Sequence, residues 1–344
     1  MQNYSIQRNT MNKLIAVTIG DIKGIGIELL IKEWKKKRIK NFVLFTSYKL
    51  LKEYINKKKI NIEIYKTSIK KNKIVFSKNL FNIYDIKASN SVNNSLLSLK
   101  ESYNLTRKKY FIGIVTLPIN KKKINKINSN FLDQTSYFTK RDNKVNSNMI
   151  FIYKNLFFSP LTIHIELRNV AKEIKNTSTI IKKIENLNKT LINDFNIKKP
   201  KYVMAGINPH NGEDGLISNE DKDYLNPIIQ KLNKKNININ GPISPDSVVN
   251  KNNLSKYNCF IFTYHDQALI PFKIISNYSG VNFTTNLEII RVSPDHGTAY
   301  DMVGNKKQSS NGIINSFKIL KKIFTNRTKY ENTKKISRTK LSNW

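Results

Sequence analysis

The chain has little cysteine and no long apolar run. Cys259 is the only cysteine among 344 residues, so no disulfide can form within the chain. Its apolar neighbours in 259–262 predict a buried strand position, and a reducing cytoplasm suits such a thiol. Residues 1–10 lack the apolar stretch of a signal peptide, and no run approaches the roughly 20 apolar residues of a membrane span. We therefore expect a soluble, cytoplasmic protein without a membrane partner.

Acidic residues are also scarce. The chain has 24 Asp and Glu against 60 Lys and Arg, for a formal charge of +36, which first suggests a nucleic-acid partner. The lysines, however, occur throughout, as in 35–37, 57–59 and 121–123, and are accompanied by abundant Asn and Ile. No zinc finger, basic zipper or aromatic-plus-Arg pattern accompanies the charge. The composition therefore indicates a chain-wide bias and no nucleic-acid partner, with a positive field that attracts anionic substrates.

Short apolar runs alternate with longer segments of helical period, which predicts an α/β fold with a mostly parallel sheet. The expected strands are 14–19, 42–45, 111–115, 202–205 and 259–263, and the expected helices are 25–34, 93–105, 219–232 and 311–324. Ligands of such sheets bind beyond the carboxyl ends of the strands, where loops lead into helices. Functional residues are therefore expected in those loops.

Two glycine-bearing turns lie at such positions. Residues 20–26 follow the first expected strand, but Leu29 stands where the dinucleotide fingerprint has its third glycine, so both a tight turn and a ligand loop remain open. Residues 295–301 precede an expected helix. They are suited either to supporting a nucleotide or to starting a helix with Thr298 as its cap.

Three of the four histidines, His164, His210 and His265, follow or end apolar strands. Three neutral imidazoles on separate strand ends can bind one divalent cation and leave a position open for a substrate oxygen. The alternative is that each histidine is merely hydrogen-bonded in its loop. The spacing contains no local ligand motif, so the residues alone leave both possibilities open.

Lys273, Asn282 and Arg291 lie farther along the chain, and together they are suited to binding a carboxylate or phosphate. In so basic a chain, an exposed surface position is the default for each of them. Lys273 follows an expected helix that begins at His265 and the apolar residues 269–272, so we expect partial burial to lower its pKa toward proton transfer.

Several of these stretches carry a family resemblance in their order and approximate spacing. They are Gly20-Asp21 through Gly24-Ile25-Gly26 with Glu28, Asn208-Pro209-His210 through Gly212-Glu213, Gly241-Pro242 with Asp246, Tyr264-His265-Asp266-Gln267, and Arg291 through Asp295-His296-Gly297-Thr298-Ala299. From about residue 13 to about residue 325, the chain resembles the 4-hydroxythreonine-4-phosphate dehydrogenases of the pyridoxal phosphate pathway.

The resemblance implies a two-lobed, three-layer α/β/α fold like that of isocitrate and isopropylmalate dehydrogenases, in a homodimer with active sites at the subunit interface. We expect 12–118 plus 284–328 to form a nucleotide-binding lobe and 119–283 to form the lobe for metal, substrate and dimerisation. The implied reaction oxidises 4-phosphooxy-L-threonine with NAD, or alternatively NADP, to 2-amino-3-oxo-4-phosphooxybutanoate, which loses carbon dioxide to give 3-amino-2-oxopropyl phosphate.

The resemblance also implies a role for each site residue. The metal ligands are His164, His210 and His265; the substrate-binding residues are Gln134, Thr135, Lys273, Asn282 and Arg291; the catalytic residues are Lys273 and Asp246; and the cofactor turn is Asp295, His296, Gly297, Thr298 and Ala299. Three imidazoles accept zinc, cobalt or manganese, and magnesium less readily.

The sequence departs from the family pattern at two places. Asp133-Gln134-Thr135-Ser136 stands where the family usually has Gly-His-Thr-Glu, and residues 116–118 lack the family's glycine. Gln134 cannot carry the positive charge of a histidine. Two alternatives therefore remain: a dehydrogenase of another phosphorylated four-carbon acid, such as phospho-threonate or phospho-erythronate, and a basic binding protein that has lost catalysis.

Overall fold

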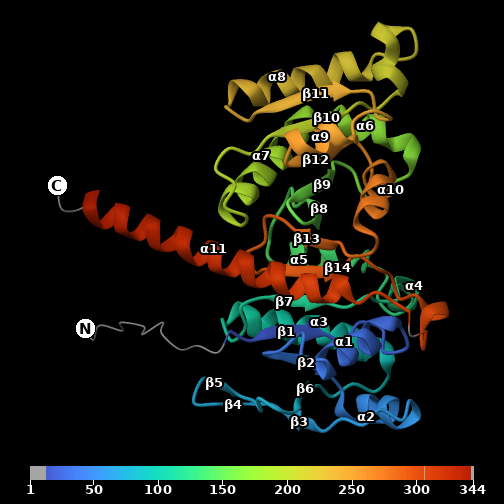
Figure 1. Cartoon of the computed structure of the whole chain (residues 1–344), viewed down its shortest axis with the longest axis vertical. Coiled ribbons are helices and arrows are strands. Elements are labelled where there is room, and N and C mark those ends of the chain that lie inside the picture. The colour runs from blue at the N-terminus through green and yellow to red at the C-terminus, as the bar shows by residue number, and fades with distance from the viewer. Residues whose placement is uncertain (1–12, 306, 342–344) are drawn as a thin grey trace.

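The computed structural model describes residues 13–305 and 307–341, and Figure 1 shows the described strands stacked along the longest axis of the molecule. The strands are β1 Ile15–Thr18, β2 Phe42–Thr46, β3 Ile64–Lys66, β4 Ser68–Lys70, β5 Lys73–Val75, β6 Phe81–Asp85, β7 Ile114–Thr116, β8 Met149–Tyr153, β9 Leu156–Pro160, β10 Tyr202–Ala205, β11 Ile239–Ile243, β12 Cys259–Phe262, β13 Val281–Thr284 and β14 Arg291–Pro294. The expected start of the first lobe at residue 12 and residues 1–10, in which we expect no signal peptide, lie outside the described residues.

The helices connect these strands. The α-helices are α1 Ile25–Lys35, α2 Tyr48–Lys57, α3 Ser91–Arg107, α4 Lys121–Asn125, α5 Gln134–Arg141, α6 Val170–Ile174, α7 Thr177–Asn193, α8 Asn226–Lys234, α9 Lys251–Lys256, α10 His265–Ser276 and α11 Asn311–Leu341. Shorter helical turns are η1 Leu167–Asn169, η2 Pro209–Gly215, η3 Asp221–Leu225 and η4 Tyr300–Met302.

Within the described residues, one sheet of twelve strands runs in the order β11-β10-β12-β9-β8-β13-β14-β7-β1-β2-β6-β3. Its pairs are parallel except β8-β9, β8-β13 and β13-β14. Every residue of β1 and of β12 is buried, as expected for strands covered by helices on both faces. Four of the expected strands are confirmed to within a residue or two at each end: 14–19, 42–45, 202–205 and 259–263.

Alternate residues of β1 face opposite helical layers. Ile15 and Val17 pack into a core with apolar residues of α1, α7, α8 and α11, whereas Ala16, together with Leu14 just before β1, packs into a second core with α3 and α5. A third core, beneath α10, covers the second face farther along the sheet. The arrangement confirms the expected α/β class with helices on both sides of a sheet.

Three local expectations were wrong. Lys273 lies inside α10, which continues to Ser276, and not after a completed helix. Thr298 caps no helix, because the next helical turn, η4, has Ala299 at its N-cap and α11 begins only at Asn311. α11 also runs far beyond the expected end at residue 324, because residues 325–341 contain no Gly or Pro, and it projects from the body in Figure 1.

The sheet order places β14 beside β7, so the chain returns after residue 284 to the half of the sheet built from residues 15–116. The division into a nucleotide-binding lobe and a metal lobe stays a prediction. None of the helices in the described part of the chain is long and apolar enough to cross a membrane.

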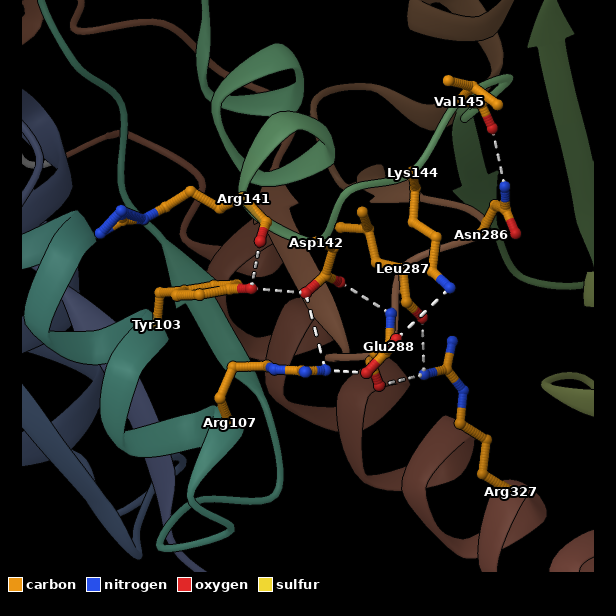
Figure 2. A network of polar contacts seen from close by, with 10 residues as sticks. All are labelled: Tyr103, Arg107, Arg141, Asp142, Lys144, Val145, Asn286, Leu287, Glu288 and Arg327. Atoms are coloured by element: carbon orange, nitrogen blue, oxygen red, sulfur yellow. Dashed lines mark hydrogen bonds and ion pairs between the residues drawn. The ribbon is translucent and has the colours of Figure 1, made fainter.

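A polar network joins α3, α11 and the segment that precedes β14 at the C-terminal end of α5 (Figure 2). The buried Asp142 carboxylate accepts hydrogen bonds from Tyr103 of α3 at 2.7 Å and from the Glu288 backbone N–H at 2.8 Å. Arg327 of α11 donates to the Leu287 and Glu288 carbonyls, and Arg107 forms an ion pair with Glu288. The network fixes the end of the helix whose first residues enter the cavity described next.

Candidate functional site

A cavity of about 320 Å³ opens beside the carboxyl end of β7, next to β13, β14 and the N-terminus of α5. Most of the site residues predicted from sequence line it: Gln134, Thr135, His164, His265, Lys273, Asn282, Arg291, Asp295, His296 and Gly297. The predicted His210, Asp246, Thr298 and Ala299 do not line it.

The histidines His164 and His265 face one another across this cavity, with ring centroids 5.7 Å apart. His164 follows β9 in the left-handed backbone region, with φ of 53°. Histidine adopts this region more readily than most other residue types, and here it lies in the bend that follows β9. His265 is the first residue of α10, and Asp266 contacts its Nδ1 at 2.9 Å.

Asp133 orients His164, a role that sequence reasoning missed. Its Oδ2 lies 3.0 Å from His164 Nδ1, and its Oδ1 caps α5 by accepting from the Ser136 N–H. Burial raises the pKa of Asp133, but the hydrogen bonds from His164 and Ser136 outweigh this and hold the pKa below its ordinary value. An ionised Asp133 accepts the Nδ1 proton, so the Nε2 lone pair of His164 stays free for a cation, as in carboxylate-histidine-metal sites.

His210 lies outside the cavity, in the exposed turn η2. Residues 210–214 all have positive φ, a costly conformation for side chains other than glycine. The buried Asp221 carboxylate holds the start of this loop by accepting from the Ile207 N–H at 2.8 Å and the Asn208 N–H at 3.2 Å. Asp221 is a second functional candidate that sequence reasoning missed.

The predicted catalytic Asp246 is exposed and lies near His210. A hydrogen bond from Ser244 lowers the pKa of Asp246, and the charge of His210 adds to this lowering. Among the described residues of one chain, no three His, Cys, Asp or Glu side chains are grouped so as to hold a metal ion. One chain thus supplies the facing pair His164 and His265, which suits a cation, and holds the His210 and Asp246 pair elsewhere.

Arg291 brings a buried positive charge to the cavity. Its side chain is 4% exposed, and its guanidinium donates to Thr116, Thr135, Thr284 and Gln134. Burial lowers the pKa of Arg291 to about 10, and the nearby charge of Asp133 opposes this, so the group is charged at neutral pH. All four acceptors are neutral, so the charge is available for an anion.

Lys273 and Asn282 complete this wall. Lys273 is exposed within the chain, contrary to the expected partial burial, because the inward-facing residues of α10 are Leu269 and Phe272. The Asn282 Oδ1 atom is buried and has no hydrogen-bond partner among the described residues. An amide oxygen in that position is ready to accept from a ligand.

The predicted cofactor turn borders the same cavity. Asp295 is buried, and burial raises its pKa to about 6, while Lys273 acts in the opposite direction. Burial also lowers the pKa of His296, although its hydrogen bond to Gly297 opposes the shift. Among the described atoms, neither Asp295 Oδ2 nor His296 Nε2 has a hydrogen-bond partner, so both are open to a ligand.

The glycine-bearing turn 20–26 supports that cofactor turn. The Ile25 N–H donates to the Thr298 carbonyl at 2.9 Å, and Tyr300 donates to the Asp21 carboxylate at 2.6 Å. A Cβ on Gly24 would lie 2.9 Å from the Thr298 carbonyl oxygen, so only glycine permits this approach. In this chain the turn therefore packs against residues 298–300 as a support.

Known proteins resemble this chain over most of its length. A protein named 4-hydroxythreonine-4-phosphate dehydrogenase from Aquifex aeolicus is 31% identical over 319 residues, which cover 90% of this chain and 98% of the relative. Another of the same name, from Sulfurihydrogenibium sp. strain YO3AOP1, is 30% identical over 315 residues, covering 89% and 96%.

Solved structures and a family profile extend the likeness. The crystal structure of 4-hydroxythreonine-4-phosphate dehydrogenase from Klebsiella pneumoniae superposes with a TM-score of 0.76 at 25% identity, covering 91% of this chain and 99% of that one. Residues 38–320 match the family described as pyridoxal phosphate biosynthetic protein PdxA. On these grounds the chain belongs to the PdxA family of pyridoxal phosphate biosynthetic proteins.

Proposed function

We propose that this chain is a 4-hydroxythreonine-4-phosphate dehydrogenase of pyridoxal 5'-phosphate biosynthesis. It oxidises 4-phosphooxy-L-threonine with NAD to 2-amino-3-oxo-4-phosphooxybutanoate, which loses carbon dioxide to give 3-amino-2-oxopropyl phosphate. Family membership supports the reaction class. The observation that carries the proposal is a cavity in which two facing imidazoles lie beside the buried guanidinium of Arg291, whose hydrogen-bond acceptors are all neutral.

The metal site is proposed to form between two copies of the chain in a homodimer. His164 and His265 of one copy supply two ligands, and His210 of the second copy supplies the third, with Asp246 beside it. The separation of the two histidine groups within one chain supports this arrangement. A bound zinc, cobalt, manganese or magnesium ion supplies Lewis acidity toward the hydroxyl and then the ketone.

The remaining residues bind and orient the substrate. Arg291, with Thr135, holds the phosphate; Asn282 accepts a hydrogen bond through its unpartnered Oδ1; and Lys273, as the neutral amine, takes the proton of the hydroxyl. The Asp295 to Ala299 turn would hold NAD, which would supply the acceptor for the hydride; NADP is the alternative cofactor. Loss of carbon dioxide follows because a β-keto group accepts the electrons of the breaking bond.

A second substrate is favoured by one observation. Gln134 replaces the family's usual histidine and lines the cavity, so the same machinery suits another phosphorylated four-carbon acid, such as phospho-threonate or phospho-erythronate. These acids have a hydroxyl where 4-phosphooxy-L-threonine has an amino group, so the site's contacts with that position decide between them.

The experiment is to measure NADH formation by the purified protein with 4-phosphooxy-L-threonine and with its hydroxy counterpart, under added divalent metal. We expect turnover of the amino substrate to be the faster. Preference for the hydroxy substrate would favour the second candidate. Salt-sensitive RNA binding, without bound metal or turnover, would overturn both in favour of a basic binding protein.

Metal analysis of single variants tests the ligand set. We expect His164→Ala, His210→Ala and His265→Ala each to lose bound metal. His296→Ala is the matched control, because His296 lies in the proposed cofactor turn, and it should retain the metal. Retention of metal by any of the three proposed ligand variants would contradict the assignment.

A further inference from the structure

The buried guanidinium of Arg291 has one more donor than the protein uses. An arginine side chain carries five N–H donors. Nε donates to Thr116, Nη1 donates to Thr135 and to Thr284, and Nη2 donates to Gln134 at 2.7 Å. Among the described residues, the second Nη2 hydrogen therefore has no acceptor, and Arg291 lines the cavity in which a substrate anion would lie.

Gln134 fixes the nitrogen that carries this remaining donor. Its Oε1 accepts from Arg291 Nη2, and its own Nε2 donates to the Leu117 carbonyl at 3.0 Å. Both contacts are buried, and Gln134 is 7% exposed. These partners determine the orientation of the amide. The guanidinium N–H needs an acceptor, which only Oε1 provides, and the Leu117 carbonyl needs a donor, which only Nε2 provides.

We propose that Gln134 is a positioning residue, which aims the free Nη2 donor of Arg291 at the phosphate of the substrate and adds no negative charge of its own beside the guanidinium. The inference rests on the proposed function for the identity of that phosphate. Both polar atoms of Gln134 have a partner in the protein, so we assign its effect on the substrate to Arg291; the second Nε2 hydrogen is the possible direct contact that the double-mutant cycle below tests. A neutral amide is suited to this role because a carboxylate there would cancel the charge that binds the anion.

Two nearly isosteric substitutions separate hydrogen bonding from charge. Gln134→Met removes both hydrogen bonds without adding charge. Gln134→Glu keeps an acceptor for Arg291, but its negative charge neutralises the guanidinium, and its second oxygen repels the Leu117 carbonyl oxygen. We expect the KM for the phosphorylated substrate to rise about tenfold in Gln134→Met and on the order of a hundredfold in Gln134→Glu, with kcat changed much less. Gln230→Glu, on the exposed side of α8, is the matched control for added charge and should leave KM unchanged.

A double-mutant cycle distinguishes positioning from direct contact. In an Arg291→Lys background no guanidinium fork remains to be held, so adding Gln134→Met should change KM by less than about twofold. A change as large as in the unsubstituted protein would show direct contact of Gln134 with the substrate and overturn the inference. An unchanged KM in Gln134→Met alone would overturn it as well.

Binding of inorganic phosphate keeps this test independent of catalysis. In calorimetric titrations, phosphate affinity should be highest in the unsubstituted protein, lower in Gln134→Met and lowest in Gln134→Glu. Thermal unfolding checks that each variant is folded. If the unsubstituted protein oxidises no phosphorylated acid but phosphate binding follows this order, the proposed function fails and the positioning role stands. If turnover is normal but phosphate binding is equal in all variants, the positioning role fails.

Discussion

The carboxylate partners of the two cavity histidines should contribute very different amounts to metal affinity. Asp133 contacts His164 at 3.0 Å with a side chain only 7% exposed, whereas Asp266 contacts His265 at 2.9 Å with a side chain 74% exposed. A buried partner of a metal-ligating histidine contributes roughly 10- to 100-fold in metal affinity. An exposed pair is screened by water and contributes about 0 to 1 kcal/mol.

Asp133→Asn is the more informative perturbation, because asparagine caps a helix as well as aspartate does and can still accept the His164 Nδ1 proton. It removes the charge while keeping the start of α5. We expect metal affinity to fall by about 10- to 100-fold, or about 1 to 3 kcal/mol, in Asp133→Asn. In Asp266→Asn the loss should stay within about fivefold.

The assay is a competition titration of each variant against a chromophoric chelator, with circular dichroism as the control for folding. Equal losses in the two variants would refute the reasoning from burial. A larger loss in Asp266→Asn would show that the exposed pair, and not the buried one, orients its ligand.

Two further predictions concern stability. The pKa of Asp295 is about 6 in the folded chain against an ordinary 3.8, so the proton binds the folded state more tightly, and this group's contribution to stability is lost as pH rises through about 6. Chemical denaturation should show the stability of Asp295→Asn, relative to the unsubstituted protein, improving by about 3 kcal/mol from pH about 3 to about 7, and a constant difference would contradict the shift. Asp142→Ala strands the Glu288 N–H and weakens the Tyr103 contact, so the free energy of unfolding should fall by about 2 kcal/mol or more, and a loss below about 0.5 kcal/mol would exclude the network of Figure 2 as a stabilising element.

Much of the fold follows from local patterns in the sequence. The run 259–262 predicts a buried strand because four consecutive apolar residues suit a sheet covered on both faces. The hairpin of β8 and β9 was missed because its turn, with Lys154 at φ of 55°, lacks the Asn-Gly or Asp-Gly pair that usually marks one.

The place of His265 was predictable because it follows an apolar strand, whereas the role of Arg291 came from the family resemblance, since the residues alone favoured an exposed position for it. The supporting contacts of the site were not predictable, because they join residues far apart in the chain: Gln134 and Arg291 are separated by 157 positions. The Asp133-to-Ser136 capping pattern was the one local signal that pointed to a helix start at the cavity. The place of His210 outside the cavity depends on tertiary structure that no local pattern contains.

The most direct test of the account mixes two variants that should each be inactive, His164→Ala and His210→Ala. If the metal site combines His164 and His265 of one copy with His210 of another, a hybrid dimer contains one site with all three imidazoles. Random reassociation of equal amounts should then restore about a quarter of the metal and of the dehydrogenase activity, since about half of the dimers are hybrids with one intact site each. Recovery of neither metal nor activity, from dimers shown to have exchanged subunits, would contradict a site shared between two chains.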